Sequence, residues 1–139
     1  MTLPAPVPEI APETAPFWAA TARGVLLLQR CGNCGTVIWY PRFVCARCHA
    51  TELAWFEASG RGTIYSFTVT TRGILEYRDC GPYVLAFVEL AEGPKMLTNI
   101  VDADPAQLSI GQAVEVVFHD TGAGSALPRF RPAVAGLAG

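Results

Sequence analysis

Hydrophobic and polar positions divide the chain into one short helix near the start and a series of short strands. Apolar residues follow Thr14 through Phe17 and Trp18 to about Ala22, which predicts a helix capped by Thr14 and ended by Gly24. After Gly24 the apolar runs are short, rich in β-branched and aromatic residues, and separated by Gly, Pro and Asp, as is typical of strands. The predicted strands cover residues 25–29, 37–39, 53–57, 63–71, 83–90, 95–101, 113–119 and 129–131.

The second half of this pattern favours a small barrel. Residues 83–90 are apolar at almost every position, which favours burial on both faces or a place in a barrel wall. Residues 91–94 form a hairpin turn, residues 102–110 a turn with a short helix, and Gly60 and Gly62 permit a bend. Five strands with one helical interruption predict a five-stranded OB-like barrel.

Four of the five cysteines form two CxxC pairs, in which ten residues separate the second cysteine from the third. Two such turns present four thiolates to one point in the tetrahedral arrangement that Zn²⁺ prefers. The site has no open position for water, so we expect one structural zinc, whose binding supplies folding energy to the segment. Iron in a rubredoxin-like site, or cysteines that hold no metal, are the alternatives. The expected ligands are Cys31, Cys34, Cys45 and Cys48, with His49 as a bystander.

No set of residues in the sequence predicts catalysis by this chain alone. Cys80 lies in a loop over residues 73–82, and a catalytic thiol needs a base beside it. The only histidines are His49 and His119, and nothing in the sequence places either next to Cys80. We therefore interpret Cys80 as a passive loop thiol.

The expected fold class is mainly β: a short N-terminal helix, a rubredoxin-like four-Cys zinc ribbon, then a five-stranded OB-like barrel. The expected division is a proline-rich arm and helix over residues 1–24, the ribbon over 25–53, the barrel over 54–132 and a flexible tail over 133–139. The first residues lack the basic region of a secretory signal, and no apolar run reaches the roughly 18 residues of a membrane span. A cytoplasmic protein with reduced cysteines is expected.

Charge narrows the choice of ligand. The 139 residues carry a net charge of −2, which disfavours nucleic-acid binding by bulk charge. The cations are nine arginines and one lysine, and arginine binds carboxylate or phosphate through a planar fork. Residues 23–52 carry four arginines and one glutamate, whereas residues 83–120 carry six acids and one lysine. Candidate contacts for the phosphates of a coenzyme, with solvated surface arginines as the alternative, are Arg42, Arg47, Arg72, Arg78, Arg129 and Arg131.

The two bulky aromatic residues of the short helix need a surface to cover. Phe17 and Trp18 can pack on the body of this chain or dock on a partner chain. We keep both as candidates for partner contact.

The ordered succession of SGRGTIYSFT, VELAEG, IGQAVEV and FRP after the ribbon resembles the zinc-ribbon OB-fold family once filed as domain of unknown function number thirty-five. The resemblance covers roughly residues 14–132. It implies a non-catalytic, zinc-binding accessory subunit in a hetero-oligomer with a thiolase-like or lipid-transfer-protein-like enzyme, which supplies the catalytic residues. CoA or acyl-CoA would be shared with that partner. The pathway stays open among aromatic acid degradation through benzylsuccinate-type acyl-CoA, polyketide-like acylation, and steroid or acetoacetyl-CoA metabolism.

Other functions compete with this one. The same resemblance also fits an accessory subunit of an acyl-CoA hydratase. A single-stranded nucleic-acid-binding module would stack bases on Tyr65, Phe67 or Tyr83, although a positive groove is missing. An iron-containing electron carrier and an independent thioesterase that uses Cys80 or His119 are the remaining alternatives.

Overall fold

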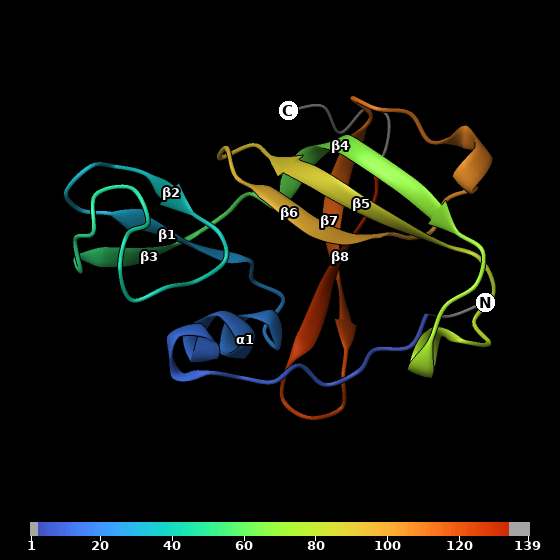
Figure 1. The fold of residues 1–139 in the computed structure, drawn as a ribbon, viewed down its shortest axis with the longest axis horizontal. Coiled ribbons are helices and arrows are strands. Elements are labelled where there is room, and N and C mark those ends of the chain that lie inside the picture. Colours follow the sequence, from blue (N-terminus) through green and yellow to red (C-terminus); the bar gives the residue numbers. More distant parts are fainter. Residues whose placement is uncertain (1–2, 134–139) are drawn as a thin grey trace.

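The chain folds into a small three-stranded sheet and a closed barrel, with the helix beside both (Figure 1). The structure is a computed structural model that describes residues 3–133. The tail expected over residues 133–139 lies almost entirely outside the described residues. Within residues 3–133, no helix has the length and apolar character needed to cross a membrane.

The helix α1 spans Ala15–Thr21 and follows the 3-10 turn η1, Pro12–Thr14. The expected Thr14 cap is wrong, because the Thr14 hydroxyl bonds back to both backbone groups of Ala11 and no side chain caps α1. Thr21 ties the helix to the barrel, since its hydroxyl donates to Trp18 O and accepts the backbone N–H of Ala126 at 3.0 Å.

The ribbon sheet contains β1 (Leu27–Cys31), β2 (Val37–Ile38) and β3 (Leu53–Glu57) in the order β2-β1-β3. All pairings are antiparallel, and β3 pairs with β1 along its whole length. The expected boundary between ribbon and barrel, at residues 53 and 54, therefore falls inside a strand of the ribbon sheet.

The barrel closes in the order β4-β5-β6-β8-β7, as the strand count predicts. Four of its five contacts are antiparallel, and β6 meets β8 in parallel where Ile100 pairs with Phe130. The expected mainly β class, with one short N-terminal helix and a five-stranded barrel, is confirmed. The elements are β4 (Arg61–Thr70), η2 (Leu75–Tyr77), β5 (Tyr83–Leu90), β6 (Lys95–Ile100), η3 (Pro105–Gln107), β7 (Ala113–Asp120) and β8 (Ala126–Pro132).

Two glycines allow the chain to pass from the ribbon into the barrel. Gly60 has φ +78°, a conformation that residues with a side chain rarely adopt, and its carbonyl accepts the N–H of Val116. A Cβ on Gly62 would lie 2.6 Å from the carbonyl oxygen of Glu89, so only glycine lets β4 approach β5 this closely. The bend expected at these two glycines is thus present.

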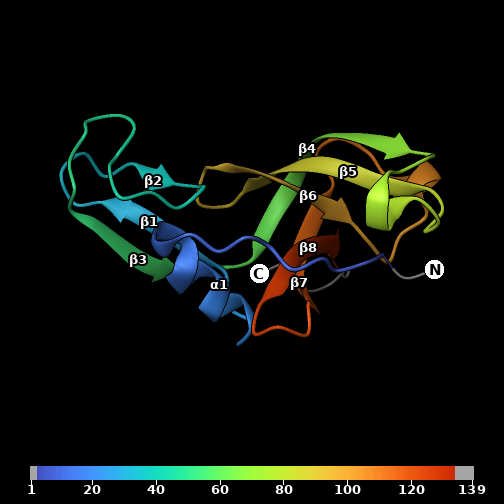
Figure 2. The same ribbon diagram turned by 60° about the horizontal axis from the view of Figure 1, so that its bottom comes forward.

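One continuous hydrophobic core joins the ribbon, the helix and the barrel, which lie close together in Figure 2. Leu28 of the ribbon and Phe17 of α1 belong to the same cluster as the inward residues of the barrel. Along β5 the inward residues are buried, but Leu85 and Phe87 face outward and are exposed. The strand is therefore a barrel wall with one exposed face rather than a strand buried on both. The inward barrel residues include Ile64, Val84, Ala86, Val88, Leu90, Met96, Val114 and Phe130.

Candidate functional site

The two CxxC turns bring their four sulfurs together at the tip of the ribbon. All four Sγ atoms lie within 4.8 Å of one another, with 3.5 Å between Cys31 and Cys48 and 3.7 Å between Cys34 and Cys45. Four thiolates at about 2.3 Å from a central zinc stand roughly 3.8 Å apart, so this donor set fits a tetrahedral Zn²⁺. Cys31 and Cys45 are buried, whereas Cys34 is exposed.

Both turns have the same backbone geometry, which identifies a conformational role for His49. Gly35 N donates to Cys31 O at 2.9 Å, and His49 N donates to Cys45 O at 2.8 Å. The matching residues Gly35 and His49 both have positive φ, at 75° and 65°. His49 thus takes the left-handed position that glycine takes in the first turn, and it lies outside the four-thiol group, as a bystander would.

Hydrogen bonds around the sulfurs favour thiolates at two positions. The Thr36 side chain and backbone lower the pKa of the Cys34 thiol to about 6. The Asn33 side-chain amide, followed by the backbone of Ala50, lowers the pKa of Cys48. Because the thiolate is the form that binds metal, these contacts prepare the site for a cation.

A buried amide that the sequence analysis missed positions the loop between the two turns. Gln29 is 3% exposed; its Nε2 donates to Arg42 O at 2.9 Å and its Oε1 accepts from Arg42 N at 2.8 Å. These two hydrogen bonds from Gln29 on β1 hold the loop against the sheet. Gln29 follows three leucines in the run VLLLQ. A single polar residue at the end of an apolar strand is the sequence feature that could have indicated a buried, hydrogen-bonded amide.

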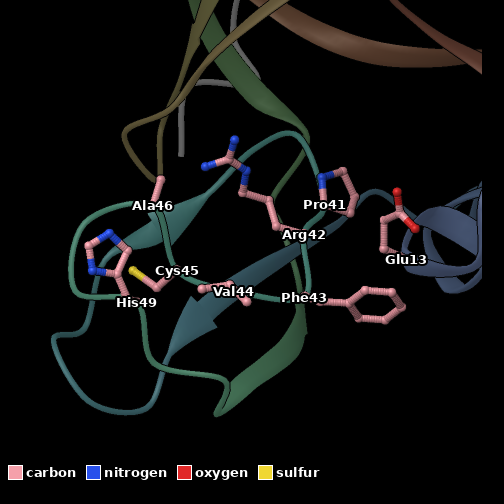
Figure 3. A pocket seen from close by; sticks show the side chains of 8 residues that line it. All are labelled: Glu13, Pro41, Arg42, Phe43, Val44, Cys45, Ala46 and His49. Atoms are coloured by element: carbon pink, nitrogen blue, oxygen red, sulfur yellow. The ribbon is translucent and has the colours of Figure 1, made fainter.

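Two clefts flank this loop. One, of about 570 Å³, runs between Glu13 and the loop, and Figure 3 shows the ring of Phe43 directed toward Glu13 while Cys45 and His49 lie on the other side. The other, of about 620 Å³, is lined by β2 and by both Arg42 and Arg47. These two arginines are exposed, and no ion pair involves them in the described part of the chain.

The structure distributes the other four candidate arginines among different surroundings. Arg72 and Arg78 are exposed on either side of η2. Arg131 pairs with Glu115 at 3.2 Å. Arg129 is 1% exposed, so the alternative of a solvated surface arginine is wrong there. Of these six described arginines, only Arg42 and Arg47 line the same cleft, and the six do not form one cluster.

The helix aromatics lie inside the chain, which favours packing on the body of this chain over docking on a partner. Phe17 is 0% exposed and Trp18 8%. The Phe17 ring lies 5.0 Å from Trp18 and 4.9 Å from Trp39 between ring centroids. Trp18 Nε1 donates to the Tyr40 hydroxyl at 3.2 Å. Both rings join helix and ribbon instead of offering a free surface.

The residues considered for other chemistries have different surroundings, although Cys80 and His119 both line a cleft of about 300 Å³ that also includes Asp102. Phe67 packs on the core, so it cannot stack a base beside the exposed Tyr65. The Cys80 thiol donates to the carbonyls of Tyr77 and Gly81. His119 accepts from Arg129, and in the described residues no hydrogen bond joins it to Cys80.

A row of apolar side chains covers the outer face of β4, β5 and β6. Phe87 and Leu97 are cross-strand partners and are 44% and 52% exposed. Leu85 lies two residues before Phe87 on the same face, and Tyr65 lies under the Lys95 ammonium at 4.6 Å. We call Tyr65, Leu85, Phe87 and Leu97 the outer apolar face.

Comparisons with known proteins agree with this architecture. The family model described as the ChsH2 rubredoxin-like zinc ribbon domain matches residues 18–54, and the model of the ChsH2 C-terminal OB-fold domain matches residues 55–119. A DUF35 domain-containing scaffold protein of Methanothermobacter thermautotrophicus is 40% identical over 92 residues, which are 66% of this chain and 69% of that protein. A probable enoyl-CoA hydratase alpha subunit of Thermomonospora curvata is 34% identical over 93% of this chain, which spans only 40% of that protein.

Solved structures extend the similarity to three dimensions. A chain of the Ltp2-ChsH2(DUF35) aldolase superimposes with a TM-score of 0.82 at 34% identity, covering 92% of this chain and 100% of that one. A DUF35 protein of Sulfolobus solfataricus shares the fold at 13% identity, with a TM-score of 0.65 over 88% of this chain and 87% of that one. Ribbon, barrel and sequence agree: this chain belongs to the DUF35 family, in the group that joins a ChsH2-type rubredoxin-like zinc ribbon to an OB-fold.

Proposed function

We propose that this chain is a non-catalytic, zinc-binding accessory subunit that binds a catalytic subunit acting on acyl-CoA. The observation that carries the proposal is the superposition on the whole of a chain from the two-protein Ltp2-ChsH2(DUF35) aldolase. The relatives described as scaffold proteins support the non-catalytic role. The relatives described as CoA hydratase subunits support the substrate class.

The metal has a structural role in this proposal. Cys31, Cys34, Cys45 and Cys48 supply four thiolates, which complete the coordination of zinc and leave no position for a substrate. The strand β2 of the ribbon sheet has only two residues. Metal binding is therefore expected to supply much of the folding energy of the ribbon.

The catalytic residues belong to the partner. The thiol of Cys80 and the imidazole of His119 are each engaged with other groups of this chain, and neither has an orienting carboxylate within hydrogen-bonding distance among the described residues. A thiolase-like or lipid-transfer-protein-like partner would supply the nucleophile or base.

The outer apolar face is the surface that we propose for the partner. Phe87 and Leu97 are cross-strand neighbours, Leu85 lies on the same side of β5, and Tyr65 is exposed on β4. Single exposed apolar residues are normal, whereas several on adjacent strands are typical of contact sites. Beside them Lys95 pairs with Glu89 at 4.0 Å, so these two opposite charges offset each other next to the apolar residues. Arg42 and Arg47, which share a cleft, are our candidates for the phosphates of CoA at the edge of the assembly.

Co-purification tests the proposal. The tagged chain is captured from its own cells, and the eluate is assayed for zinc, for a stoichiometric second subunit and for turnover of acyl-CoA. We expect one zinc per chain and a larger subunit whose activity the isolated chain lacks. The double substitution Phe87→Ser and Leu97→Ser should lose the subunit but keep the zinc, whereas the matched exposed substitution Phe43→Ser should keep both. A zinc protein that elutes alone, or with nucleic acid, would refute the assembly.

The hydratase alternative is favoured by the relative that matches 93% of this chain. The same eluate distinguishes the two reactions. A hydratase partner adds water to an enoyl-CoA, whereas a thiolase or aldolase partner cleaves a carbon–carbon bond. Loss of absorbance from the conjugated enoyl thioester therefore identifies the first, and release of a shortened acyl-CoA identifies the second.

A further inference from the structure

Arg129 is a buried cation on which three other segments of the chain converge. Its Nη1 donates to His119 Nδ1 at 2.8 Å, and its Nη2 donates to Pro4 O at 2.6 Å and to the Tyr77 hydroxyl at 3.1 Å. The acceptors lie on the N-terminal arm, η2 and β7, while Arg129 lies on β8. The side chain is 1% exposed, so these neutral groups have replaced its water.

Among residues 3–133, no carboxylate forms an ion pair with Arg129. The ion pairs of the described residues join Lys95 to Glu89 and Arg131 to Glu115, and none involves Arg129. Its Nε is buried without any hydrogen-bond partner. Burial lowers the pKa of the Arg129 guanidinium. The pKa of His119 is lowered mainly by burial and, to a smaller extent, by the nearby positive charge of Arg129. A buried donor without an acceptor destabilises the fold, and more so when it is charged, so an anion at this point would be stabilised.

The N-terminal arm covers this cation. Residues 3–10 form an extended arm that, in Figure 1, crosses the β7–β8 hairpin near the turn that joins the two strands. Pro4, Pro6 and Pro8 have no N–H to donate. Among the described residues, the bond from Arg129 to Pro4 O is the only hydrogen bond between residues 3–10 and the rest of the chain. Release of the arm therefore breaks one hydrogen bond and exposes the half-buried residues 3–6 and Pro8.

Nε and Nη2 form the edge of a guanidinium that binds carboxylates and phosphates through two parallel hydrogen bonds. Nη2 donates to Pro4 O, while Nε donates to nothing. We propose that Arg129 is the anion-binding residue of a site covered by the N-terminal arm, in which a carboxylate or phosphate oxygen replaces Pro4 O and a second oxygen accepts from Nε.

The surroundings favour an oxyanion that is attached to an apolar body. Arg129 and Tyr77 line a cleft of about 200 Å³ between ribbon and barrel. The other walls are mostly aromatic and aliphatic, and they include Trp18, Trp39, Tyr40, Met96, Leu97 and Leu127. An aromatic or short aliphatic acid, or its phosphate ester, fits this combination of charge and wall. The inference does not depend on partner binding.

Release of the arm gives a direct readout. Glu9 lies in the arm, so a glutamate-specific protease reports when the arm leaves the barrel. The purified zinc-loaded chain is treated with the protease in the presence of benzoate, phenyl phosphate or inorganic phosphate, and cleavage after Glu9 is followed by mass spectrometry. We expect benzoate or phenyl phosphate to accelerate cleavage by about tenfold, the factor expected for loss of one charge-assisted hydrogen bond. Benzamide, which is neutral, should have no effect.

Two variants and one truncation decide the outcome. Arg129→Gln should abolish the acceleration, while Arg131→Gln, a surface control, should keep it. Because Arg129→Gln removes a buried group and can unfold the chain, a chain that lacks residues 1–8 serves as the second test. It should bind the same acids about tenfold more tightly by calorimetry, since Pro4 O no longer competes.

The three probes also separate the sources of the oxyanion. An effect of inorganic phosphate equal to that of phenyl phosphate indicates a free-phosphate site, and an effect of the aromatic acids alone indicates an organic acid. No acceleration by any of the probes, or equal affinity of the full and truncated chains, would overturn the proposal. Loss of partner binding would leave these results unchanged, so the two proposals fail separately.

Discussion

Truncation of Phe17 is the sharpest test of how helix, ribbon and barrel are joined. Its side chain is completely buried, and its ring touches those of Trp18 and Trp39 and approaches Tyr40 at 6.2 Å between centroids. Phe17→Ala in such a site removes about 3–5 kcal/mol of the free energy of unfolding. Small domains have only about 5–15 kcal/mol in total, so the loss is a large fraction of it.

The assay is urea unfolding at a fixed zinc concentration, followed by tryptophan fluorescence. With a slope of about 1–3 kcal/mol per molar urea, the midpoint should fall by more than about 1 M. Phe43→Ala is the matched control, because Phe43 is 64% exposed and its truncation should change stability by no more than about 0.5 kcal/mol. A loss below about 1 kcal/mol for Phe17→Ala, or an equal loss in both variants, would refute the packing that we describe.

Three further predictions concern the ribbon and the barrel. Cys45→Ser should lose the bound zinc and the folded ribbon because Cys45 is fully buried among the sulfurs, whereas Cys80→Ser should keep one zinc per chain; elemental analysis and circular dichroism measure both. His49→Gly should raise the free energy of unfolding by about 1 kcal/mol, because glycine adopts φ 65° without strain. Its zinc content should stay unchanged if His49 is a bystander, and loss of zinc would contradict that role. The lowered pKa of His119 means that the unfolded chain binds its proton more readily, so stability should be full above about pH 6.5 and fall below it. Urea midpoints at pH 7.5 and 5.5 should differ less in His119→Gln than in the wild type, and an equal difference would contradict this.

Features that depend on neighbouring residues could be predicted from the amino-acid sequence alone. Two CxxC pairs predict two turns and one four-thiol site, because a turn of four residues brings its own cysteines together. The alternation and β-branched runs predict β3 and β5 with their observed ends, and Glu92 and Gly93 mark the hairpin turn between β5 and β6. The five-stranded barrel follows from the same local signals.

Which side chains are buried depended on the three-dimensional fold. Arg129 and Arg131 look alike in the sequence, yet the first is buried by residues 125 and 52 positions away and the second pairs at the surface. The burial of Phe17 likewise depends on its ring contact with Trp39, and that of Gln29 on its hydrogen bonds to the backbone of Arg42. Burial of these side chains depends on contacts between segments that are distant in the chain. Such contacts close long loops and leave no periodic pattern in the local sequence from which they could be predicted.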